Sequence, residues 1–354
     1  MAVEELAIRV PVKVRELGHQ RLAFAVMIAF FALAPTVIYP VFLMKVMCFA
    51  LFACAFNLLL GFGGLLSFGH AMFLGTAGYV AAHAAKEGFA IDGIHLFGNT
   101  IPIHIGLPPF TPELAILAGA AASGVLGLAT GLIAIRRQGI YFAMITLALA
   151  QMVFFFYLQA PFTHGEDGIQ AVPRGRLFGV IDLSDARAMY VLVFVIFIGG
   201  FLLIYRIIHS PFGQVLKAIR ENEPRAISLG YDADRYKLLA FVLSAILSGA
   251  AGATNALVFQ LAALNAAHWT MSGEVVLMTL VGGLGTIFGP VVGALIVLAM
   301  ENYLAQLGAW VTIVQGFVFV FCVLAFRRGI VGELTHFLSK RDGIRTKADQ
   351  TPRK

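Results

Sequence analysis

Three short charged segments separate long stretches of this chain that hold almost no charge. Residues 1–21, 209–237 and 327–354 carry 27 of the 44 charged residues in a chain of 354. The stretches between them are rich in aliphatic and aromatic residues, and a membrane-spanning helix needs about 20 such residues in succession. Only 12% of the residues are charged. Because water-soluble domains carry about 25%, a soluble enzyme is excluded.

The apolar pattern predicts an all-α, polytopic integral membrane protein with about ten transmembrane segments, one of them short or broken. The predicted spans are 22–40, 41–61, 64–85, 113–135, 139–160, 188–208, 237–259, 273–284, 286–305 and 310–327. The chain then divides into an N-terminal segment (1–21), a transmembrane domain (22–332) and a basic tail (333–354).

The Lys and Arg residues lie mainly on one side of the predicted spans. With the N-terminus in the cytoplasm, 20 of the 25 fall in cytoplasmic segments or at cytoplasmic span ends. Since Lys-rich and Arg-rich loops stay in the cytoplasm, we expect both termini there, together with the loop 209–236. The same distribution explains the net charge of +6 without a nucleic-acid partner.

Two glycine-rich segments interrupt the apolar pattern. An odd number of crossings must separate the outer loop 260–272 from Arg327 and Arg328 inside, so the apolar stretch 273–305 is expected to break at its glycines. The segments 61–69 and 282–289 share one pattern: Gly-Gly-Leu, then a hydroxyl residue, then Phe-Gly. Matched breaks in two halves indicate a pathway near the bilayer midplane, whereas close helix packing is the alternative. The candidate pathway residues are Asn57, Gly63, Gly64, Ser67, His70, Gly282, Gly283 and Gly285. For His70 the alternative is a packed histidine that bonds a neighbouring helix.

The loop 209–236 contains helix-capping residues that a plain connector does not need. Ser210, Asn222 and Asp232 are placed to start helices, and Gly230 to end one in a left-handed conformation. Val215, Leu216 and Ile219 form an apolar stripe on the first helix. The second predicted helix runs from Glu223 to Leu229. Two capped amphipathic helices suit the docking of a partner better than a solvated connector does.

Several motifs occur in the order found in one family of transport proteins. They are Phe56-Asn57-Leu58 with residues 63–71, Tyr141 to Ala148, Gly165 to Ile169, Arg220 to Gly230 with residues 237–245, and Phe326 to Gly332. Over roughly residues 40–332 the chain resembles the LivM-type permeases of branched-chain amino acid ABC importers. The resemblance implies a type II-like permease fold and a multi-pass protein of the bacterial inner membrane, in contact with lipid.

The resemblance also implies partners and roles for individual residues. The implied partners are a LivH-like second permease, two cytoplasmic ABC ATPases like LivG and LivF, and a periplasmic substrate-binding protein. The implied ATPase-coupling residues are Arg220, Glu221, Glu223, Ala226 and Gly230, although Pro224 and Arg225 depart from the family's Glu-Ala-Ala pattern. Glu166 and Asp167 are candidate contacts for the binding protein. The preceding Thr163-His164-Gly165 departs from the family's Thr-Gly-Gly.

Motifs for catalysis are absent from the sequence. It contains no Gly-x-x-x-x-Gly-Lys-Ser/Thr phosphate loop, no His-Glu-x-x-His zinc helix and no Gly-x-Ser-x-Gly elbow. We therefore expect no catalytic residue, metal site or cofactor, and the energy for transport must come from a partner chain or an ion gradient.

An ion-coupled secondary transporter is the main rival interpretation. Such carriers place carboxylates inside their spans, yet Glu274 and Glu301 fall near the outer span ends, as does Lys45. The absence of acids from the middle of the membrane disfavours this rival.

The resemblance implies leucine, isoleucine and valine as substrates. Urea or short-chain amides are the alternative, because the apolar pathway offers no ion-pair partner that would identify a zwitterion.

Overall fold

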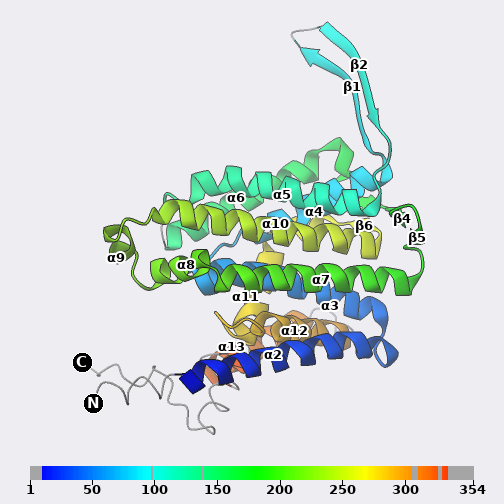
Figure 1. The fold of residues 1–354 in the computed structure, drawn as a ribbon. Coiled ribbons are helices and arrows are strands. Elements are labelled where there is room, and N and C mark those ends of the chain that lie inside the picture. Colours follow the sequence, from blue (N-terminus) through cyan, green and yellow to red (C-terminus); the bar gives the residue numbers. More distant parts are fainter. Residues whose placement is uncertain (1–9, 97–98, 138, 305–309, 326–328, 334–354) are drawn as a thin grey trace, which may run out of the picture.

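The computed structural model describes residues 10–96, 99–137, 139–304, 310–325 and 329–333. Each predicted span corresponds to a helix in this part of the chain, and the helices lie side by side as a bundle (Figure 1). They are α2 (Val10–Leu33), α3 (Pro40–Asn57), α4 (His70–Lys86), α5 (Pro112–Ala134), α6 (Ile140–Gln159), α7 (Ala186–His209), α10 (Ala233–Phe259), α11 (Trp269–Gly282), α12 (Gly289–Leu304) and α13 (Trp310–Ala325). The prediction of a polytopic helical protein is confirmed.

Five helices of the described chain are long and apolar enough to cross a membrane by length and composition. They are α3 together with the π-helix η2 (Leu58–Phe62), α5, α6, α7 and α10. The helices α11 and α12 are shorter, with 14 and 16 residues, and residues 283–288 separate them. The break that the crossing parity required in the stretch 273–305 is therefore present.

The helix α3 lies at the centre of the bundle. In its most apolar window 89% of the residues are buried inside the chain, against 28% for α7. Its sequence is apolar on every face from Val46 to Phe56, as expected for a helix surrounded by others. The α7 helix buries one stripe that includes Phe197 and Phe201, and its other faces are open to lipid or a partner.

The loops at one end of the bundle form strands that were not predicted from the apolar pattern of the sequence. β1 (Phe89–Leu96) and β2 (Asn99–Leu107) pair as an antiparallel hairpin that projects from the bundle (Figure 1). Most of the described part of the loop 86–112 is therefore in strands. Two further antiparallel pairs are β3 (Ile169–Gln170) with β6 (Leu261–Ala262), and β4 (Arg176–Leu177) with β5 (Ile181–Asp182).

The two ends of the bundle differ in the structure of their loops. α8 (Pro211–Glu221) and α9 (Glu223–Ser228) lie at one end, which we call the loop end, and the strands lie at the other, the strand end (Figure 1). The helix α2 begins at Val10, inside the segment that was expected to precede the first span. Residues 1–9, Arg327, Arg328 and the tail from 334 lie outside the described residues.

Candidate functional site

The loop between α7 and α10 has the capped helices that its sequence predicts. The side-chain oxygens of three N-cap residues accept backbone N–H bonds: Ser210 from Gly213 at 3.3 Å, Asn222 from Arg225 at 3.1 Å and Asp232 from Arg235 at 3.2 Å. Gly230 has a φ of +90°, which favours glycine after a helix end. The caps fix both short helices in place against the bundle.

The apolar stripe of α8 packs on the glycine segment that follows α3. Leu216 and Ile219 are buried, and Leu216 covers Gly63, where a Cβ atom would lie 3.7 Å from the leucine Cδ1. Lys217 Nζ lies 5.4 Å from the centre of the Phe62 ring, and partial burial lowers the pKa of this lysine. The α8 helix is therefore a packed part of the bundle.

Arg220 connects α8 to the same glycine segment by a hydrogen bond. Its Nη1 donates to the carbonyl oxygen of Gly61. Its Cγ would lie 2.9 Å from a Cβ on Gly64, which has a φ of +73°. A residue with a side chain at Gly64 would be strained and would push Arg220 away. The charged loop thus contacts the end of α3 directly.

The two glycine-rich segments lie side by side, although more than 220 residues separate them. The Asn57 side chain donates from Nδ2 to the carbonyl of Thr286 at 2.8 Å and accepts from the Gly285 amide at 3.0 Å. One carboxamide therefore satisfies two backbone groups that the break in helical structure leaves free. The first segment follows a complete 23-residue helix, Pro40–Phe62, and contacts α8. Both segments lie on the side of the bundle where α8 packs, near the loop end.

The sequence similarity of the two segments corresponds to a shared local geometry. Ser67 Oγ accepts from the Gly69 amide at 3.2 Å just before α4. Thr286 Oγ1 accepts from the Gly289 amide at 3.1 Å at the start of α12. In each segment the hydroxyl oxygen thus accepts an N–H from a glycine at the boundary of the next helix, and α4 begins at His70 and not at residue 64.

His70 is fully buried inside the bundle. Its Nε2 lies 2.8 Å from Ser244 Oγ, which itself donates to the Ala55 carbonyl at 2.6 Å. Because the serine proton is used there, the histidine must donate from Nε2, and its Nδ1 has no partner among the described residues. The rings of Phe56, Phe73 and Phe241 surround it edge-on. These are the contacts of a packed histidine.

A buried ion pair holds α9 on α10. Lys237 Nζ lies 2.5 Å from Glu223 Oε1, and Lys237 is 3% exposed. A buried ammonium group requires such a partner, because its desolvation is costly. Lys237 was not among the predicted site residues, because the sequence gives it the same appearance as the other Lys and Arg residues at cytoplasmic span ends. Glu221 and Gly230 are exposed, and Ala226 is buried.

The tip of the loop exposes apolar side chains to the surroundings. Ile227, Leu229 and Tyr231 are 55%, 70% and 40% exposed, respectively. They follow one another at the end of α9, next to the exposed Glu221 and Arg225. An apolar tip with a charged rim is the composition of a protein-binding surface.

The acidic turn lies at the opposite, strand end. Glu166 and Asp167 are exposed on the short helix η4 (Gly165–Asp167). His164 adopts a left-handed φ of +58°, so this chain places a histidine in a conformation that glycine adopts more readily. A Cβ on Gly168 would lie 2.2 Å from the Ala262 carbonyl, so close packing on β6 fixes the position of the turn.

A polytopic helical bundle with a capped, amphipathic loop at one end is the fold of an integral membrane protein, and similarity to known proteins specifies its family. Residues 38–323 match the family described as "Branched-chain amino acid transport system / permease component". The chain belongs to this family and is a non-catalytic permease component of an ABC transporter.

Three curated relatives agree with this assignment. The high-affinity branched-chain amino acid transport system permease proteins LivM of Escherichia coli K12 and Salmonella typhimurium LT2 are 23% and 24% identical over 80% of this chain and 68% of their own length. The ribose import permease protein RbsC of Bacillus subtilis is 27% identical over 75% of this chain and 81% of its own length. No solved structure matches the chain.

Proposed function

We propose that the chain is one permease subunit of an ATP-driven importer for leucine, isoleucine and valine. Two relatives named as branched-chain amino acid permeases, similar over 80% of the chain, support this substrate class. In this proposal a periplasmic binding protein delivers the substrate. A LivH-like second permease completes the pathway, and two LivG/LivF-like ATPases supply the energy.

The observation that carries the proposal is the capped loop between α7 and α10. An ATPase docked on the apolar tip would move α8, α9 and the start of α10 together, because Ile219, Ala226 and Ala233 form one buried cluster and Lys237 pairs with Glu223. Arg220 would pass this movement to Gly61 at the end of α3. Binding and hydrolysis of ATP would then shift the subunit between two conformations with different contacts at the loop.

The proposed orientation places the loop end in the cytoplasm and the strand end in the periplasm, within the inner membrane. The excess of Lys and Arg in the loop-end segments supports it. Glu166 and Asp167 would then face the binding protein. Asn57, Gly63, Gly64, Ser67, Gly282, Gly283 and Gly285 would form the cytoplasmic end of the pathway, with His70 packed behind them.

A second candidate substrate is a pentose. The similarity to a ribose import permease over 75% of the chain favours it. A sugar is uncharged, so it makes different demands on the pathway from those of an amino acid, and a transport assay separates the two.

The test is reconstitution in proteoliposomes of the chain with the second permease, ATPases and binding protein from its gene neighbourhood. We expect ATP-dependent uptake of leucine that isoleucine and valine inhibit and that ribose and urea do not. Leu229→Glu should release the ATPases and abolish uptake, whereas the exposed strand-end control Val180→Glu should keep both. Uptake of ribose would replace the proposed substrate. Leucine uptake without ATPases would show an ion-coupled carrier instead.

A further inference from the structure

A cavity of about 370 Å³ opens near the strand end of the bundle. Residues of α3, α4, α10, α11 and α12 line it, and residues 261–266 close it on the side of the strands. Phe49, Leu74, Met271 and Phe259 make much of its wall apolar. Gly75, Gly78 and Gly252 also line it, and Gly75 and Gly252 let α4 approach its neighbours closely, since a Cβ on either would overlap Ala267 or the Leu74 carbonyl. The cavity is large enough for a small organic molecule.

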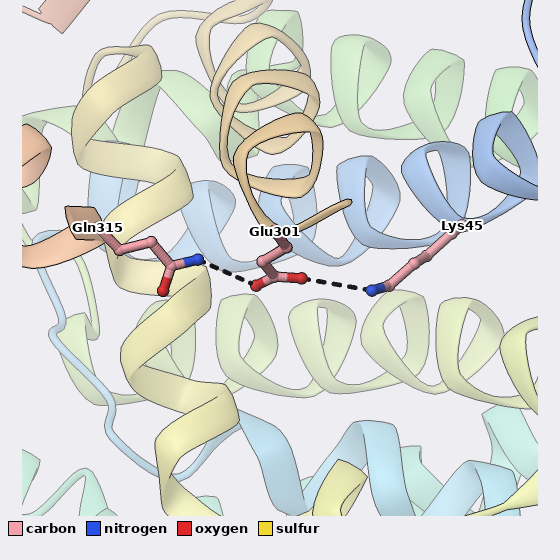
Figure 2. Close-up of polar contacts among 3 residues, drawn as sticks. All are labelled: Lys45, Glu301 and Gln315. Atoms are coloured by element: carbon pink, nitrogen blue, oxygen red, sulfur yellow. Dashed lines mark hydrogen bonds and ion pairs between the residues drawn. The ribbon is translucent and has the colours of Figure 1, made fainter. Parts of the chain in front are cut away.

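Three charged side chains line this otherwise apolar space. Lys45 Nζ on α3 lies 3.3 Å from Glu301 Oε2 on α12. Gln315 of α13 donates to the other oxygen of Glu301 at 3.4 Å, so Glu301 lies between the two side chains (Figure 2). Glu274 of α11 lines the same cavity, within electrostatic range of both Glu301 and Lys45.

The charges do not balance one another within the cavity. Two carboxylates face one ammonium group, so the described side chains have capacity for one more cationic group. Asn255 also lines the cavity, and its buried Oδ1 has no hydrogen-bond partner among the described residues. Ionisable groups inside membrane domains are costly and are retained mainly at functional sites. A ligand that brings its own ammonium group would satisfy both the carboxylate and the carboxamide oxygen.

On the basis of the proposed function, we propose that this cavity binds the substrate as a zwitterionic amino acid with an apolar side chain. Its carboxylate pairs with Lys45, its ammonium group with Glu274 and Glu301, and its side chain contacts the apolar wall. The binding protein would release substrate at the strand end, where this cavity lies. An uncharged sugar or urea brings neither an ammonium group for Glu274 nor a carboxylate for Lys45, so the site selects against both.

The test uses the reconstituted importer and neutral variants of the charged residues. Lys45→Met and Glu274→Gln should each lower leucine uptake at limiting leucine by roughly ten- to a hundredfold, the effect of losing a hydrogen bond to a charged group. Glu87→Gln is the matched control, because it removes a carboxylate at the same end of the bundle outside the cavity, and uptake should be unchanged. Copurification of the ATPases should be unaffected in all three variants.

An exchange of the ion pair separates substrate binding from a purely structural role. Lys45→Glu with Glu301→Lys keeps the pair and its charge but reverses the order of the charges. A structural pair would restore uptake in this double variant, and that result would overturn the proposal. We expect the double variant to fold, retain its ATPases and still fail to take up leucine.

Two further results have different meanings. If the wild-type complex takes up ribose or urea but not leucine, the proposed function fails together with this site. If it takes up leucine and both neutral variants do so equally well, the function stands and the site is refuted. A sodium requirement that Glu274→Gln removes would also refute it, because the carboxylate would then bind a cation and not the substrate.

Discussion

Arg220 joins the loop to the membrane-spanning helices by a hydrogen bond. Its guanidinium group bonds the Gly61 carbonyl at the end of η2, and its stem packs on Gly64. The carbonyl lies where regular helical bonding ends, so the arginine replaces a partner that the backbone cannot supply. Together with Leu216, which covers Gly63, this side chain holds α8 at the end of the α3–η2 helix.

Removing this guanidinium group should weaken both stability and coupling. Arg220→Met keeps an apolar stem but leaves the Gly61 carbonyl without its charged donor, at a cost of about 1.5 to 3 kcal/mol. A lower melting temperature of the purified chain would show the lost bond. ATP hydrolysis by the complex should continue with reduced uptake. The control is Arg187→Met, an exposed arginine at the strand end of α7, and equal losses in both variants would contradict a specific role for Arg220.

The hairpin of α11 and α12 depends on the close approach of two backbones. A Cβ on Gly282 would lie 1.9 Å from the carbonyl oxygen of Gly289. Gly329 packs there as well, since its Cβ would lie 2.3 Å from Gly283 Cα. Small residues at these positions let three segments of the chain meet at the loop end, as is common where helices pack in membranes.

Alanine substitutions in α11 should therefore have opposite effects at its two glycines. Gly282→Ala should destabilise the protein by about 1 to 3 kcal/mol, because the new methyl group overlaps backbone that cannot move freely. Gly273→Ala has no atom within 4 Å of the new Cβ and should be neutral or slightly stabilising. Thermal unfolding of both variants in detergent would decide. Equal melting temperatures of the two variants would show that α11 and α12 can separate enough to accept a methyl group at position 282 without a loss of stability.

Local chemistry explains which elements could be predicted from the sequence. The caps at Ser210, Asn222 and Asp232 depend only on residues up to three positions away, and all three are present. The hairpin β1–β2 was missed because a search for long apolar runs does not detect strands. Ile101, Ile103 and Ile105 alternate with other residues across this segment, and that period of two is the signal for a strand.

At the scale of the whole molecule, contacts between distant segments could not be predicted from the sequence. Glu301 and Lys45 are 256 positions apart, and each was predicted only to lie near an outer span end. Likewise, the similarity of the two glycine segments did not predict the hydrogen bonds from the Asn57 side chain, just before the first segment, to the backbone of the second. Packing of the bundle sets such pairings, and no local pattern encodes them. The charge distribution nevertheless predicts a definite orientation for the complete subunit.

That orientation can be measured with single cysteines in a variant whose three native cysteines are replaced by alanine. Val180→Cys lies between β4 and β5 at the strand end, and Asp234→Cys lies in the first turn of α10 at the loop end; both positions are exposed. A membrane-impermeant maleimide added to cells with a permeable outer membrane should label the cysteine at 180. It should label the one at 234 only after the inner membrane is opened, because Lys-rich and Arg-rich segments stay in the cytoplasm. The reverse pattern would place the cavity with Lys45 and Glu301 on the cytoplasmic side, where a binding protein could not deliver substrate to it.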